Sequence, residues 1–195
     1  MKLLIATTNA HKREELRKML EGMDIDLLTL RDFPDAPEVV EDRETFEGNA
    51  RKKASETAQF AGLYTMADDS GLCVDALDGR PGVRSARYAG PNPTKEKLCR
   101  KLLGEMEGVA DEDRTAAFHC CAAFARPSGE IVFTVEGTCD GTITREMRGE
   151  EGFGYDPVFL YPSEGVTFAE MAPEQKNNVS HRANALKKLR DRLEE

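Results

Sequence analysis

The stretch Tyr64-Thr65-Met66-Ala67-Asp68-Asp69-Ser70-Gly71-Leu72-Cys73-Val74 decides the fold. Its two ends are apolar and prone to extended structure, whereas its middle is acidic or small. We predict a strand over residues 64–67, a turn over residues 68–71 and a further extended segment over residues 72–74. Gly71 permits the turn, because glycine tolerates backbone conformations that other residues avoid. Two carboxylates would then lie at the end of a buried strand.

Strand and helix patterns alternate on the N-terminal side of this stretch. A strand is predicted over residues 2–6, a helix around Leu16 and Leu20, and a second strand over residues 25–30. Between residues 45 and 61, alanines recur three or four positions apart, which predicts a long helix with a small-residue face. We expect that helix to pack closely on a sheet.

The C-terminal side is richer in strands. Residues 79–94 contain many Gly and Pro, which predicts a long ordered loop before a helix around Leu98. Residues 116–125 and 131–137 are predicted to form a hairpin, and residues 180–193 a closing helix. The whole order indicates the α/β class, with an elongated mixed sheet, flanking helices, two lobes and a central cleft. We expect residues 1–195 to form a single domain.

Composition excludes several classes of protein. Of the 195 residues, 39% are hydrophobic and 32% charged, which is typical of a folded soluble protein. No apolar run approaches the roughly 18 residues of a membrane span, and the first residues favour a strand over a signal peptide, so we expect a cytoplasmic protein. The balance of 27 basic against 36 acidic residues gives −9, which argues against binding to DNA or RNA. Five cysteines without a C-x-x-C pair indicate reduced thiols.

A candidate phosphate site follows the first predicted strand. Free backbone N–H groups and the positive dipole end at the start of a helix favour phosphate, and a lysine there adds a charge. The glycines of a Walker loop are missing, and an ordinary capped helix start explains the same residues, so both readings stay open. The residues are Thr7, Thr8, Asn9, Ala10, His11 and Lys12.

A candidate metal site lies at Asp68 and Asp69. Two carboxylates can hold Mg²⁺ through oxygen ligands, and a carboxylate can also take a proton from water. Glu41, in the acidic stretch 38–47, would add a further oxygen ligand. The alternatives are an Asp-rich turn and a solvated acidic loop.

A candidate base-binding site lies further along the chain. Residues 152–157 place two aromatic side chains among glycines, and Phe153 could stack on a nucleobase, although a tight turn with an aromatic plug has the same pattern. Lys176, His181 and Arg182 lie near the start of the last predicted helix, where they could bind an anion or a base carbonyl. A surface helix start is the alternative there.

Six blocks of sequence occur in order over nearly the whole chain. They are Ala6-Thr7-Thr8-Asn9 with Lys12, Thr45-Phe46 with Asn49-Ala50 and Lys53-Ala54, Ala67-Asp68-Asp69-Ser70-Gly71, Pro81-Gly82-Val83 with Ser85-Ala86-Arg87-Tyr88, Gly152-Phe153-Gly154-Tyr155-Asp156-Pro157, and Ser180-His181-Arg182. Together they resemble the inosine triphosphate pyrophosphatase family, also called XTP/dITP pyrophosphatases. Thr8 stands where the family more often has Gly, and Gly48 where an acidic residue is common.

The resemblance implies an elongated α/β fold, usually a homodimer, that uses Mg²⁺ to hydrolyse ITP, dITP or XTP to the monophosphate and pyrophosphate. It implies that Asp69 is the catalytic proton acceptor and a metal ligand, Glu41 the second ligand and Asp68 a weaker candidate. The residues implied to hold triphosphate and sugar are Thr7 to Lys12, Lys53, Ser70 and Lys176. Those implied to recognise the base are Phe153, Gly154, Tyr155, Asp156, His181 and Arg182.

Base choice follows from hydrogen-bond chemistry. Hypoxanthine and xanthine present an O6 acceptor and an N1–H donor, so donors from His181 or Arg182 would reject adenine. Guanine would have to be rejected at its 2-position. Two rival functions stay open: a pyrophosphatase of the structurally related septum-associated family that acts on modified pyrimidines, and a non-catalytic nucleotide sensor on the same fold.

Overall fold

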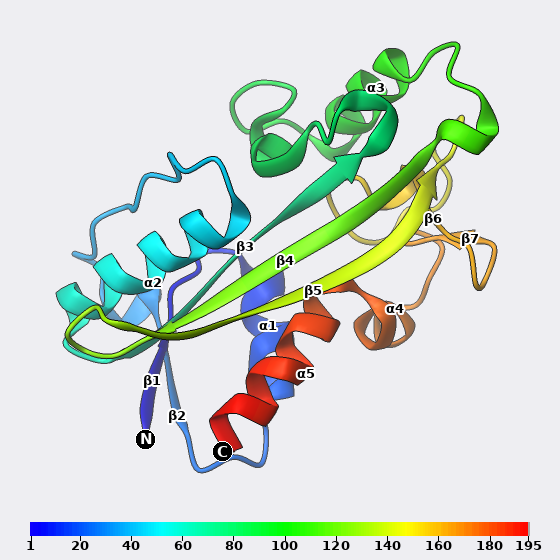
Figure 1. The fold of residues 1–195 in the computed structure, drawn as a ribbon. Helices are drawn as coiled ribbons and strands as arrows, with labels where there is room; N and C mark the ends of the chain where they lie inside the picture. The colour runs from blue at the N-terminus through cyan, green and yellow to red at the C-terminus, as the bar shows by residue number, and fades with distance from the viewer. Residues whose placement is uncertain (195) are drawn as a thin grey trace. The chain divides into compact units, whose positions relative to one another are not determined.

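The computed structural model describes residues 1–194, apart from the side chains of Ala10 and His11, so the predictions for those two side chains lie outside the described residues. The strands form one seven-stranded sheet in the order β2-β1-β3-β4-β5-β6-β7 (Figure 1). β1 pairs in parallel with β2 and β3, whereas β5, β6 and β7 pair antiparallel. The strands are β1 (Lys2–Ile5), β2 (Asp26–Thr29), β3 (Tyr64–Val74), β4 (Thr115–Ala125), β5 (Ile131–Ile143), β6 (Phe159–Tyr161) and β7 (Val166–Thr167).

Helices flank the sheet, so the predicted α/β class is confirmed (Figure 1). They are α1 (Ala10–Met19), α2 (Phe46–Ala61), α3 (Lys95–Glu105), α4 (Pro173–Val179) and α5 (His181–Glu194). Short 3₁₀ helices, such as Gly82–Arg87 in the long loop, connect some of these elements. Within the described part of the chain, no helix is long and apolar enough to cross a membrane.

The chain divides into two compact units, which correspond to the predicted lobes. The first unit contains Met1–Asp69, Cys120–Gly137 and Arg182–Glu195. The second unit contains Ser70–His119 and Thr138–His181. The chain therefore passes between the units four times: within the acidic block of β3, within β4, within β5 and at the start of α5.

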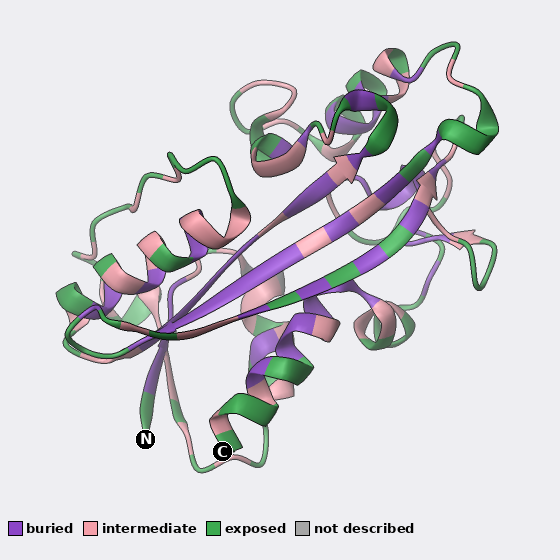
Figure 2. Cartoon of the chain, in the orientation of Figure 1, coloured by how far each residue is buried: buried purple, intermediate pink, exposed green. Residues whose placement is uncertain are grey.

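Both faces of the sheet are covered in the first unit. On one face, the alanines of α2 pack against β3 and β4, as the small-residue pattern predicted; Ala50, Ala54 and Ala58 are completely buried. On the other face, α1 and α5 contribute leucines that pack against Met66 and Phe124. Neighbouring residues of β3 and β4 thus serve opposite faces, as the alternation of a strand requires. Figure 2 shows β4 buried over most of its length.

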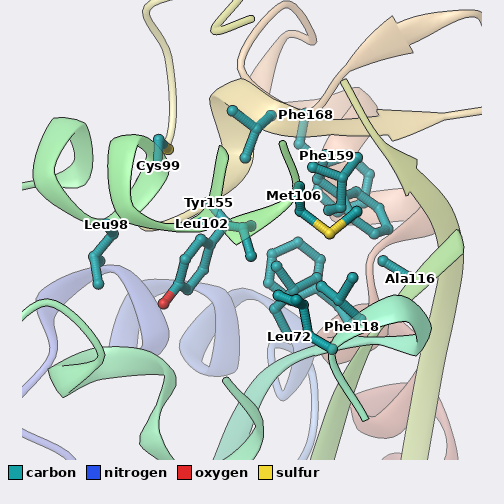
Figure 3. Packing of buried hydrophobic residues seen from close by; sticks show 14 of the residues in the cluster. Leu72, Leu98, Cys99, Leu102, Met106, Ala116, Phe118, Tyr155, Phe159 and Phe168 are labelled. Carbon is teal, nitrogen blue, oxygen red and sulfur yellow. The ribbon is translucent and has the colours of Figure 1, made fainter. Parts of the chain in front are cut away.

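The second unit has its own aromatic core. The Phe118 and Phe159 ring centroids lie 4.6 Å apart, and those of Phe159 and Phe168 lie 4.8 Å apart (Figure 3). Leu102 and Met106, at the end of α3, are completely buried in the same cluster. Offset and tilted aromatic pairs of this kind add stabilisation beyond the apolar area that they bury.

The prediction of a turn over residues 68–71 was wrong. β3 runs without interruption from Tyr64 to Val74, and within this acidic block only Ser70 is not fully buried. β3 is a central strand, with β1 on one side and β4 on the other. Its hydrogen bonds to these two strands outweigh the local turn preference of Asp, Ser and Gly. The helix α4 and the short strands β6 and β7 were not predicted, and β5 extends beyond the predicted hairpin arm.

Candidate active site

Because β3 continues through both residues, the side chains of Asp68 and Asp69 lie on opposite faces of the sheet. Asp68 faces α1 and α5, where its Oδ2 lies 2.8 Å from Lys12 Nζ and 3.6 Å from Arg182 Nε. Asp69 faces α2, where its Oδ2 accepts a hydrogen bond of 2.9 Å from Asn49 Nδ2. The two carboxylates therefore do not share a single metal site.

Asp68 belongs to a buried network of charges. Arg182, which is itself buried, also pairs with Glu15 Oε2 at 2.6 Å. Burial alone would raise the pKa of Asp68, but Lys12 and then Arg182 attract its charged form and hold the pKa well below its ordinary value. Asp68 thus stays ionised, and its partners are protein cations. Asp68 therefore holds the side chains of Lys12 and Arg182 in place.

Asp69 has the opposite electrostatic character. Burial and the nearby Glu41 carboxylate raise its pKa, although the hydrogen bond from Asn49 and the charge of Lys53 work in the other direction. A carboxylate with a raised pKa is a better proton acceptor near neutral pH than an ordinary aspartate. The raised pKa of Asp69 is therefore consistent with its predicted role as the catalytic base.

Glu41 lies in a segment without helix or strand, and its carboxylate pairs with Lys53 Nζ of α2. Burial lowers the pKa of Lys53, but Glu41 and Asp68 more than restore it, so the pKa is raised and the ammonium stays charged. A cation thus already lies beside Glu41. Because Glu41 also raises the pKa of Asp69, these two carboxylates repel each other across a site that a divalent cation would stabilise.

The donor set fits Mg²⁺. This ion is commonly bound by one or two carboxylates together with substrate phosphates and water. Among the described residues, no group of three or more His, Cys, Asp or Glu side chains forms a metal cluster. Glu41 and Asp69 would therefore leave most coordination positions for phosphate oxygens and water.

The start of α1 has the contacts of a capped helix. Asn9 Oδ1 accepts from the backbone N–H of Lys12 at 3.3 Å, and Thr7 Oγ1 accepts from that of Asn9 at 3.2 Å. Thr8 is exposed, and Lys12 directs its ammonium to Asp68. The helix cap accounts for Asn9, and a local turn before the helix accounts for Thr7, without a ligand. Their predicted contact with phosphate stays a prediction.

The second unit brings Phe153 and Asp156, two of the predicted base-binding residues, together with Lys176. Asp156 is buried, and its Oδ2 accepts from the Phe153 backbone N–H at 2.7 Å and from Lys176 Nζ at 2.5 Å. Lys176 Nζ also lies 4.5 Å from the centroid of the Phe153 ring. Gly152 has φ 71°, and a Cβ there would lie 2.1 Å from Asp156 Oδ2, so only glycine fits beside the carboxylate. An aromatic face, a cation and a carboxylate thus lie together.

Tyr155 and His181 lie deeper than the sequence analysis expected. Tyr155 is buried in the aromatic core (Figure 3). Its hydroxyl donates to the backbone oxygen of Ser85 at 2.9 Å. The Tyr155 side chain therefore anchors its loop, residues 152–157, in the core. This agrees with the alternative interpretation of that loop as a tight turn with an aromatic plug. The His181 ring stacks on Phe118 with centroids 4.7 Å apart and is buried. Ser70 is half-buried on β3, and Gly154 adopts φ 59° in the loop.

Comparison with known proteins identifies the family. The model of the Ham1 family matches residues 3–192. This chain belongs to the Ham1 family. A Ham1 relative from Geobacter sulfurreducens, named dITP/XTP pyrophosphatase, is 52% identical over 192 residues, which cover 98% of this chain and 96% of the relative. The resemblance stated from the six sequence blocks is confirmed.

Solved structures of Ham1 proteins have the same fold. The HAM1 protein from Coxiella burnetii has a TM-score of 0.93 and 39% identity, covering 99% of this chain and 98% of that chain. A structure from Mycobacterium abscessus, described as nucleoside-triphosphatase / dITP/XTP pyrophosphatase, has a TM-score of 0.81 and 43% identity, with 97% of each chain covered.

Three polar residues near the predicted site residues were given no role in the sequence analysis. They are Asn49, which holds Asp69, Glu15, which holds Arg182, and Lys52, which contacts the residues on either side of Glu41. A signal existed for Asn49: it lies four positions before Lys53, so both side chains share one stripe of α2. Glu15 and Lys52 resemble ordinary solvated helix residues, and their sequence context gave no comparable signal.

Proposed function

We propose that this protein hydrolyses ITP, dITP and XTP to the nucleoside monophosphate and pyrophosphate, and so removes non-standard purine nucleotides from the nucleotide pool. The observation that carries the proposal is that one stripe of α2 holds both carboxylates: Asn49 donates to Asp69 at 2.9 Å, and Lys53, four positions later, pairs with Glu41. The names of the relatives that match almost the whole chain support the same reaction.

We propose that Asp69 and Glu41 hold Mg²⁺. When bound, this ion would neutralise phosphate charge and lower the pKa of a coordinated water. Asp69 accepts a proton from the attacking water, whose oxygen forms a bond to the α-phosphorus. The bond from the α-phosphorus to the bridging oxygen breaks, and pyrophosphate leaves with that oxygen. Lys53 offsets negative charge that develops on the leaving group.

The proposed contacts with substrate follow the local environments. Residues 7–12, Lys53, Ser70 and Lys176 hold triphosphate and sugar. Phe153 stacks on the base, because its ring is only partly buried and lies beside Lys176 and Asp156. His181, oriented by Phe118, and Arg182, oriented by Glu15, are the proposed donors to the purine O6. Tyr155 supports this loop from the core.

We also propose that the protein is a cytoplasmic homodimer. The homodimer rests on the family resemblance, and the cytoplasmic location rests on the composition of the chain. Sedimentation of the full chain over a range of concentrations tests the dimer, because a homodimer would sediment at twice the mass of 21.6 kDa. A constant mass of one chain at all concentrations would contradict it.

A nucleotide panel with pyrophosphate detection, run with and without Mg²⁺, tests the function. ITP, dITP and XTP should release pyrophosphate far faster than ATP or GTP, and only with the metal present. Modified pyrimidine triphosphates belong in the panel, because preferential release from them would favour the septum-associated activity. A sensor would bind ITP without releasing pyrophosphate, and no release from any purine triphosphate would contradict the proposal.

A further inference from the structure

The segment Val40–Arg43 carries Glu41 and is held by polar contacts from α2. Lys52 Nζ donates to the backbone oxygen of Val40 at 2.9 Å and pairs with Asp42 Oδ2 at 2.9 Å. The backbone N–H of Arg43 donates to Asn49 Oδ1 at 2.9 Å. Together with the pair of Lys53 and Glu41, these contacts reach all four residues of the segment from one helix.

The conformation of the segment depends on such contacts more than that of a strand would. The segment has no helical or strand structure, and the Val40 side chain is 66% exposed, so it gives no apolar anchor. Lys52, in contrast, is held close to the protein, with only 16% of its side chain exposed. An ammonium carries three donors, which allows one lysine to hold a carbonyl and a carboxylate together.

We propose that Lys52 is a positioning residue that fixes the place of Glu41 and thereby sets the affinity of the protein for a divalent cation. The inference rests on the proposed function in taking Glu41 as a metal ligand. Lys52 contacts the residues immediately before and after Glu41, so it holds the backbone on both sides of that carboxylate. Residues that orient metal ligands commonly change metal affinity about 10-fold or more when they are replaced.

Lys52 and Lys53 therefore have different tasks. Lys53 contacts the Glu41 carboxylate itself and is a proposed ligand of the triphosphate. Asn49 links the same segment to Asp69, because its Oδ1 accepts from Arg43 and its Nδ2 donates to Asp69. A change at Lys53 or Asn49 would remove a direct contact with Glu41 or Asp69, the proposed metal ligands. Lys52 contacts neither carboxylate, so replacing it tests the placement of the segment alone.

The test compares Lys52→Met with Arg51→Met. Methionine keeps an unbranched side chain with good helix propensity but has no ammonium. Arg51 is the preceding residue of α2 and pairs with Glu47, so R51M is a matched control for loss of one positive charge from the helix. Three quantities are measured on the full chain: Mn²⁺ binding without nucleotide, the Mg²⁺ concentration for half-maximal pyrophosphate release from ITP, and hydrogen exchange of the amides of residues 40–43.

K52M should bind Mn²⁺ about 10-fold more weakly, need about 10-fold more Mg²⁺, and exchange the segment amides faster, while kcat at saturating Mg²⁺ stays within about twofold of wild type. R51M should match wild type in all three. A K52M protein whose metal dependence equals that of R51M overturns the proposal, whatever its exchange rates. If the wild type releases no pyrophosphate, the proposed function fails, and Mn²⁺ binding still decides the role of Lys52.

Discussion

Asp68 and Asp69 are adjacent in the chain, yet their surroundings give them different properties. Asp68 lies against two protein cations, and its pKa is lowered despite complete burial. Asp69 lies beside an amide donor and another carboxylate, and its pKa is raised. The difference arises because β3 continues through both residues and turns one side chain to each face. One aspartate therefore stabilises the fold, and the other is available for chemistry.

Replacing Asp69 with Asn should lower kcat for ITP by about 10³-fold while the fold is kept. The amide oxygen can still accept the hydrogen bond from Asn49, so packing around β3 survives. Steady-state pyrophosphate release, with thermal unfolding as the measure of folding, checks this. Asp75→Asn, at an exposed aspartate just after the same strand, is the control and should keep wild-type kcat. A D69N enzyme with near-normal kcat would remove Asp69 from the mechanism.

Replacing Asp68 with Asn should lower the free energy of unfolding by about 3 kcal/mol at pH 7, because Lys12 and Arg182 lose their buried counter-charge. The folded pKa of Asp68 lies below the value of about 3.9 expected in the unfolded chain. Its contribution is therefore complete above about pH 4 and is lost as the pH falls towards the folded pKa. Urea unfolding at several pH values should show the gap between wild type and D68N narrowing below pH 4; a constant gap would contradict this account.

At the scale of elements, the sequence predicted those that have their own periodicity or caps. The alanine repeat located α2, whose Thr45 side chain accepts from Gly48 and whose C-terminal Gly62 adopts φ 64°. The acidic part of β3 could not be predicted, because its residues favour turns and only pairing with neighbouring strands makes them extended. α4 is polar and short, and its one local signal is Pro173 at its first position.

The residues of the candidate site likewise divide into those that have a local sequence signal and those whose role depends on folding. The sequence located Asp69, Glu41 and the Gly152–Pro157 loop, because each has an unusual local composition. Local composition alone did not separate the tasks of Asp68 and Asp69; the family resemblance favoured Asp69, and the physical difference between them depends on which helix covers which face of the sheet. Asn49 and Lys52 were missed for a related reason: their partners lie elsewhere in the chain and are brought near only by folding.

The Gly152–Pro157 loop gives a test at this scale. Gly152→Ala would place a methyl group against Asp156 Oδ2 and break the contacts of that carboxylate with Phe153 and Lys176. Gly165→Ala, in the turn before β7, is the matched control, because its φ is also positive but no atom lies within 4 Å of the added Cβ. Both changes should cost about 1 kcal/mol of backbone strain.

Only G152A should lower kcat/KM for ITP strongly, by about 10- to 100-fold, which corresponds to one or two lost charge-assisted hydrogen bonds. Kinetics with ITP and thermal unfolding of both variants separate local strain from loss of substrate binding. Equal losses of kcat/KM in G152A and G165A would show that the Asp156 carboxylate is not the sensitive element.

At the scale of the whole molecule, stability and metal binding arise from different parts. Each unit has its own apolar core, formed by packed leucines and alanines in the first and by stacked phenylalanines in the second. Hydrophobic burial of this extent supplies most of the stability of a chain of 195 residues. The proposed Mg²⁺ ligand Glu41, by contrast, lies on an extended surface segment and is already paired with Lys53.

Removing the metal should therefore stop the reaction without unfolding the protein. With EDTA present, pyrophosphate release from ITP should disappear, while the melting temperature falls by no more than about 3 °C, which corresponds to about 1 kcal/mol for a chain of this size. Added Mg²⁺ should restore activity, and Ca²⁺ should restore less, because the larger ion prefers six to eight oxygen ligands in a looser geometry. A large fall in melting temperature on chelation would instead indicate a metal that holds the fold together, and the assignment of Glu41 and Asp69 to catalysis alone would then be wrong.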